Sequence, residues 1–122
     1  MDTKGIILLV EDEKYLREPF ARHLEFEGYT VFSYKNFGSA KRDIEGGLIY
    51  DVGLIDRSLD DEFDGDELIN ICKKINPLKP VISLSGYSSR KYTYQNPDGQ
   101  LVKGSIAKNI LLSAIERALN KK

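Results

Sequence analysis

The chain has 122 residues, which is enough for one domain that buries roughly two thirds of its unfolded surface. Its 18 basic and 19 acidic side chains leave a net charge of −1, so no overall charge attracts nucleic acid or an anionic membrane. The longest apolar run, Ile6–Val10, is far shorter than the ~18 residues of a membrane span, and no signal-peptide pattern precedes it. We therefore expect one cytoplasmic domain over residues 1–122, with no direct contact to nucleic acid or membrane.

The first half of the chain alternates strand and helix patterns. Ile6–Val10 lacks in/out alternation, as a strand buried on both faces should. Apolar residues at helical spacing follow up to Gly28, and Pro19 inside this pattern can kink the helix because it removes a backbone donor. A second strand is predicted over Thr30–Tyr34, and a second helix before the glycines at 46 and 47.

The second half continues the alternation. Val52–Ile55 and Val81–Leu84 read as strands, and between them Leu68, Cys72 and Ile75 form a helical stripe that places the single cysteine in the core. A short strand at Leu101-Val102 precedes a helix with a clear apolar face. The segment from Ser88 to Gly99 is too polar and interrupted for a full helix, so a short or irregular fourth helix is expected there. The pattern predicts an α/β domain with one doubly wound parallel sheet.

Polar residues follow the predicted strands, at the edge where such sheets bind ligands. Glu11 and Asp12 follow the first strand, Asp56 the third, Ser85 the fourth and Lys103 the fifth. Each is commonplace alone, but together they hold the parts of a phosphoryl-transfer site that uses Mg²⁺. Three carboxylates and one ammonium leave a charge of −2, which one Mg²⁺ balances. We assign Asp56 as nucleophile, Glu11 and Asp12 as metal ligands, Ser85 as hydroxyl donor and Lys103 as phosphoryl-facing cation.

The chain resembles the receiver domains of bacterial response regulators, a family that includes the single-domain chemotaxis regulator. The resemblance covers nearly the whole chain and rests on Glu11-Asp12, Leu54-Ile55-Asp56 with Leu59, Asp64-Gly65, Leu84-Ser85-Gly86 and Leu101-Val102-Lys103. It implies five parallel strands in the flavodoxin-like order 2-1-3-4-5. It also implies that Asp56 is the phosphoacceptor, that the Ser58 carbonyl is a further metal ligand, and that a sensor histidine kinase or histidine phosphotransfer protein is the donor. The domain would catalyse only its own phosphorylation and dephosphorylation, and would signal to an unidentified effector by a change of shape.

Several positions depart from the family pattern. The loop at 60–64 is one residue longer than usual and has Asp60 in place of a proline. Gln100 replaces the aromatic residue that moves inward on activation, and Gly104 replaces the proline after the lysine. Ser58 and Tyr87 occupy positions that modulate phosphoryl lifetime in the family. Ser58 is too short to orient a water and Tyr87 is large enough to cover its approach, so a long lifetime is expected.

Other functions fit the residues less well. A pseudo-receiver that binds a partner without phosphate is the main alternative, and the intact set of site residues argues against it. A haloacid-dehalogenase-type phosphatase would need a second aspartate at Ser58. Flavodoxin-type FMN binding is disfavoured because the acidic residues 11–13 would repel a phosphate, so no organic cofactor is expected. No basic patch with interleaved aromatic residues indicates nucleic-acid binding.

Overall fold

The computed structural model describes residues 3–59, 64–86, 97–103 and 108–120. Five parallel strands form one sheet in the order β2-β1-β3-β4-β5, which confirms the predicted fold class. The strands are β1 (Ile6–Val10), β2 (Thr30–Tyr34), β3 (Val52–Asp56), β4 (Val81–Ser85) and β5 (Gly99–Val102). The helices in these ranges are α1 (Lys14–Phe26), α2 (Phe37–Glu45), α3 (Asp64–Ile75) and α4 (Lys108–Asn120). None of them is long and apolar enough to cross a bilayer.

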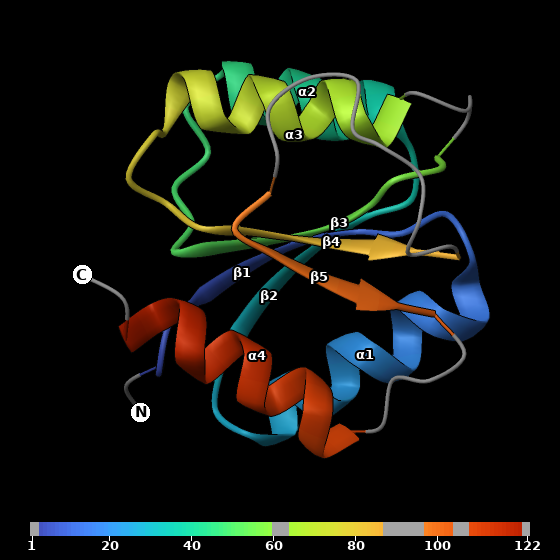
Figure 1. Ribbon diagram of the computed structural model, residues 1–122, viewed down its shortest axis with the longest axis vertical. Coiled ribbons are helices and arrows are strands. Elements are labelled where there is room, and N and C mark those ends of the chain that lie inside the picture. Colours follow the sequence, from blue (N-terminus) through green and yellow to red (C-terminus); the bar gives the residue numbers. More distant parts are fainter. Residues whose placement is uncertain (1–2, 60–63, 87–96, 104–107, 121–122) are drawn as a thin grey trace.

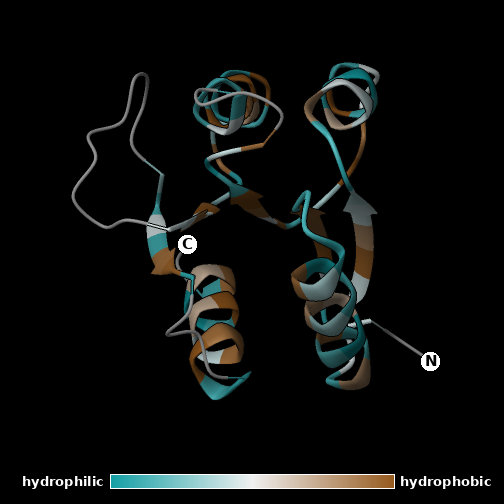
Figure 2. Ribbon diagram, turned by 90° about the vertical axis from the view of Figure 1, so that its right-hand side faces the viewer, coloured by the Kyte–Doolittle hydropathy of each residue, from teal (hydrophilic) through white to brown (hydrophobic). Residues whose placement is uncertain are grey.

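The helices form two layers around the sheet. Helices α1 and α4 cover one face, and α2 and α3 cover the other (Figure 1). Successive side chains of β1 enter opposite cores, with Ile7 and Leu9 on the α1/α4 side and Leu8 and Val10 on the α2/α3 side. Each helix carries both hydrophilic and hydrophobic residues (Figure 2), and its buried apolar residues belong to one of the two cores. Burial on both faces explains why the inner strands lack alternation.

Most element predictions agree with the structure, and the differences lie at strand ends. Strands β3 and β4 each include one residue more than expected, Asp56 and Ser85, and β5 begins two residues earlier, at Gly99. Helix α1 continues through Pro19, which is solvent-exposed. Cys72 is fully buried, as predicted. The expected short or irregular fourth helix falls mainly on residues 87–96, outside the described residues.

The strand register brings the carboxyl ends of the inner strands to one edge. Asp56 is paired in register with Leu84, and the Arg57 amide donates to the Leu84 carbonyl at 2.8 Å. The Lys103 amide donates to the Ser85 carbonyl at 2.7 Å. These backbone bonds extend the sheet past its last regular residues, so the side chains that follow the strands are held by the same framework.

Candidate functional site

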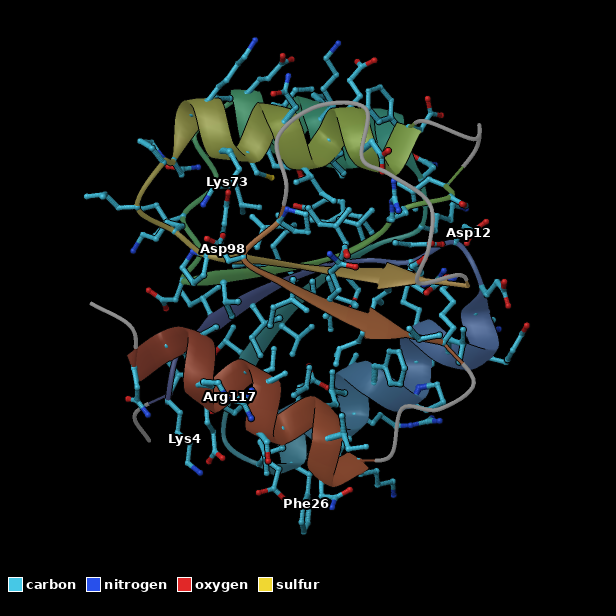
Figure 3. All side chains as sticks on the ribbon, in the orientation of Figure 1. Lys4, Asp12, Phe26, Lys73, Asp98 and Arg117 are labelled. Carbon is cyan, nitrogen blue, oxygen red and sulfur yellow. The ribbon has the colours of Figure 1, made fainter. Side chains whose placement is uncertain are left out.

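The residues predicted to act together do meet at the carboxyl edge of the sheet. Glu11 and Asp12 follow β1, Asp56 ends β3 and Lys103 follows β5. One carboxylate oxygen from each of the three acidic residues lies within 4.8 Å of the others. Figure 3 shows Asp12 at this edge, at the end of the molecule where α1 begins. Residues separated by more than 90 positions thus form one cluster, as the parallel topology requires.

Lys103 is the counter-charge of the cluster. Its Nζ lies 3.0 Å from Asp56 Oδ2 and 3.1 Å from Glu11 Oε1, and it donates to Glu11 Oε2 at 3.2 Å. Backbone amides supply further donors, from Ser58 to Asp56 Oδ1 at 3.0 Å and from Glu13 to Glu11 Oε2 at 3.1 Å. One ammonium therefore bridges two buried carboxylates.

This environment disfavours negative charge on Glu11 and Asp56. Burial, followed by the charge of Asp56, raises the pKa of Glu11 from 4.5 to about 8. Burial also raises the pKa of Asp56, although the Ser58 amide and Lys103 act against it. For Lys103, burial alone lowers the pKa, but the hydrogen bonds and charges of Asp56 and Glu11 outweigh it and the net shift is upward. The single positive charge of Lys103 is not enough to stabilise both Glu11 and Asp56 in their ionised forms.

The donor set fits a hard divalent cation. Glu11 Oε1 and Asp56 Oδ2 are buried, and within the described part of the chain no donor is well oriented to hydrogen-bond them, although the Lys103 ammonium lies 3.1 and 3.0 Å away. Buried charged oxygens without further donors are costly, and carboxylate oxygens are the ligands that Mg²⁺ takes in proteins. Asp12 is exposed, so the cluster opens to solvent on one side. A Mg²⁺ ion would supply the missing positive charge.

The other predicted residues differ in their setting. Ser85 is buried at the end of β4, and Ser58 is exposed just after β3. Tyr87 and Gly104 lie outside the described residues. A hollow of about 800 Å³ between α3, β5 and α4 is lined by none of the cluster residues, so it is separate from the acidic cluster at the sheet edge.

Two charged residues next to the cluster were not predicted from the sequence. Arg57, directly after Asp56, is 1% exposed and pairs with the equally buried Asp66 of α3. An Arg in the loop after a strand and an Asp in the first turn of a helix are each typical of solvated positions, so their residue types gave no signal. Gly65 was noted as a motif residue, but its close contact with the Asp56 backbone was not foreseen.

Comparison with known proteins agrees with the geometry. Residues 7–120 match the response regulator receiver domain family, while the curated proteins give no match. A CheY-like receiver domain protein from Methanospirillum hungatei JF-1 is 28% identical, with a TM-score of 0.87 over 98% of this chain and 95% of that one. NtrX from Brucella abortus is 26% identical, with a TM-score of 0.80 over 94% of this chain and 27% of the longer NtrX chain.

Chemotaxis response regulator CheY4 of Vibrio cholerae, at 21% identity, has the same fold, with a TM-score of 0.83 over 96% of this chain and all of that one. The family match covers 114 of the 122 residues, because it runs from residue 7 to residue 120. The chain belongs to the response regulator receiver domain family of two-component signalling systems.

Proposed function

We propose that this receiver domain accepts a phosphoryl group on Asp56, with Mg²⁺ held by Glu11, Asp12, Asp56 and the carbonyl of Ser58. The observation that supports this most directly is the buried Asp56 carboxylate, 3.0 Å from Lys103 Nζ and beside two further acids. A structural aspartate in a core would have its hydrogen bonds satisfied. Among the described residues, none donates a well-oriented hydrogen bond to Asp56 Oδ2, which leaves this oxygen available to form a new bond.

The proposed reaction is a transfer from a phosphohistidine donor. A carboxylate oxygen of Asp56 forms a bond to phosphorus while the phosphorus–nitrogen bond of the donor breaks, and its electron pair returns to the imidazole. Lys103 would stay ion-paired to the phosphoryl oxygens, and the Ser85 hydroxyl would donate to one of them. Bound Mg²⁺ would neutralise the charge on those oxygens. The chain would thus catalyse only its own phosphorylation and dephosphorylation.

The donor would be a sensor histidine kinase or a histidine phosphotransfer protein, and the output a change of shape read by an effector protein or domain. Family membership supports a kinase partner in general terms. The cytoplasmic location inferred from the sequence stays a prediction.

Labelling with a small phosphodonor tests the assignment. Acetyl phosphate or phosphoramidate should add one phosphoryl group to the parent protein in the presence of Mg²⁺ and none in chelator, as read by intact mass spectrometry. Asp56→Ala should abolish the label. Asp43→Asn is the matched control, because Asp43 is a hydrogen-bonded aspartate on α2 outside the cluster, and it should label like the parent.

Two results would contradict the assignment. Label that persists in Asp56→Ala would place the acceptor elsewhere. A parent protein that never labels would favour the pseudo-receiver, a domain of the same fold that binds its partner without phosphate.

A further inference from the structure

Arg57 is a buried charged side chain next to the proposed acceptor. It is among the largest fully buried side chains of the described residues. Arginine is almost never buried in this way without a partner. Its Nε donates to Asp66 Oδ1 at 2.8 Å and its Nη2 donates to Asp66 Oδ2 at 2.9 Å. The pair is a two-pronged ion pair whose side chains are 2% and 1% exposed.

The pair joins the acceptor strand to the start of α3. Asp66 lies in the first turn of α3, and the preceding Gly65 donates its amide to the Arg57 carbonyl at 3.1 Å. A Cβ on Gly65 would overlap the Asp56 carbonyl oxygen and the Arg57 backbone. On the other side, the Arg57 amide donates to the Leu84 carbonyl of β4. The peptide after Asp56 is therefore held by β4, by the α3 backbone and by the ion pair.

Stability alone is a weak reason for such a pair. The free energy needed to remove two charges from water is about as large as the free energy gained from their attraction. Apolar residues of similar volume can therefore often replace a buried ion pair without loss of stability. A bidentate pair of an arginine with a carboxylate fixes the relative orientation of the two side chains as well as their distance, which an apolar contact does not. Arg57 lies directly between Asp56 and Ser58 in the sequence, and this location indicates a geometric role at the site.

We propose that Arg57 and Asp66 are positioning residues for phosphoryl transfer to Asp56. The pair fixes the backbone of residues 56–58, and with it the Asp56 carboxylate, whose Oδ1 accepts the Ser58 amide hydrogen bond and whose Oδ2 faces Lys103. Neither residue touches the phosphoryl group. This inference rests on the proposed phosphorylation of Asp56 and adds to it the residues that hold the acceptor in place.

The test is a double variant, Arg57→Met with Asp66→Leu, which removes both charges and keeps an apolar contact of similar size. Its unfolding in urea should be cooperative, with a midpoint at or above that of the parent. Its rate constant for phosphorylation by acetyl phosphate, measured on folded protein, should fall by about 10-fold or more, because misplacement of a reacting group by about 1 Å can cost 10²-fold. The dissociation constant for Mg²⁺, measured by calorimetry without phosphodonor, should rise several-fold.

The matched control is Lys73→Met, which removes a different ion pair of α3, a 2.8 Å contact with Asp98. Lys73 and Asp98 lie at the opposite end of the sheet from Asp12 (Figure 3). This variant should keep the parent rate and Mg²⁺ affinity whatever its stability.

A folded double variant with the parent rate and Mg²⁺ affinity refutes the positioning role and leaves the proposed function intact. If the double variant does not fold, Arg57→Lys provides the same test, because lysine keeps the charge but loses the fork. Its rate should be reduced, and a rate equal to the parent's refutes the role. A parent that takes up no phosphate refutes the proposed function and the positioning role together.

Discussion

Neutralising Glu11 should stabilise the metal-free protein at neutral pH. Glu11 is fully buried, and its pKa is raised to about 8 from the ordinary 4.5. Between these two pH values the folded state retains a proton that the unfolded chain has released. The free energy of unfolding therefore falls by about 1.4 kcal/mol per pH unit as pH rises through this window. The fall ends near pH 8, where Glu11 is ionised in both the folded and the unfolded state.

The size of the effect follows from that slope. From pH 5 to pH 7, Glu11 alone should lower the free energy of unfolding by about 3 kcal/mol. Glu11→Gln removes the titrating group, so in chelator the free energy of unfolding of this variant should depend much less on pH. Asp56, whose pKa is also raised, contributes a slope of the same sign in both proteins. At a denaturant slope of about 2 kcal/mol/M, the parent's urea midpoint should drop by about 1.5 M more than the variant's.

Mg²⁺ should make the parent more stable than Glu11→Gln, the reverse of their order in chelator. It binds the ionised carboxylates, so millimolar Mg²⁺ should stabilise the parent at pH 7 by mass action and flatten its pH dependence. Glu11→Gln lacks one ligand and should gain less. The assay is urea unfolding at several pH values between 5 and 8, with chelator and with Mg²⁺.

The control is Glu18→Gln, which changes a half-exposed glutamate on α1 that forms only a 3.9 Å pair with Lys14. It should follow the parent under all conditions. The reasoning is refuted by equal pH slopes for the parent and Glu11→Gln in chelator, or by equal stabilisation of both by Mg²⁺. Either result would mean that buried Glu11 does not destabilise the metal-free protein or does not bind the cation.

Two further predictions concern the segment around the acceptor. Gly65→Ala should destabilise the protein by roughly 3 kcal/mol, because the new Cβ would overlap the backbone of Asp56 and Arg57; chemical denaturation measures this, and a loss below about 1 kcal/mol would show that α3 can shift freely. For phosphoryl lifetime, Ser58→Asn should speed dephosphorylation by orienting a water and Tyr87→Ala by uncovering its path. Following the loss of phosphate after removal of the donor decides this, and unchanged rates in both variants would refute the shielding argument.

The sequence alone was sufficient to predict the cluster at the sheet edge. Continuous apolar runs identified the inner strands, because a strand buried on both faces cannot alternate. Parallel strands end at one edge, so the residues after each strand could be predicted to meet without any knowledge of distances. In the structure, Lys103 Nζ lies 3.1 Å from Glu11 Oε1 and 3.0 Å from Asp56 Oδ2.

Only the tertiary structure showed which charged residues are buried and what they contact. Arg57 follows the last residue of β3, and its burial depends on an ion pair with Asp66, which comes from α3. The raised pKa of Glu11 likewise depends on burial and on the charge of Asp56. The need for glycine at position 65 arises from the approach of the α3 backbone to β3. Burial and close approach depend on how separate elements pack, and a local residue pattern does not record that packing.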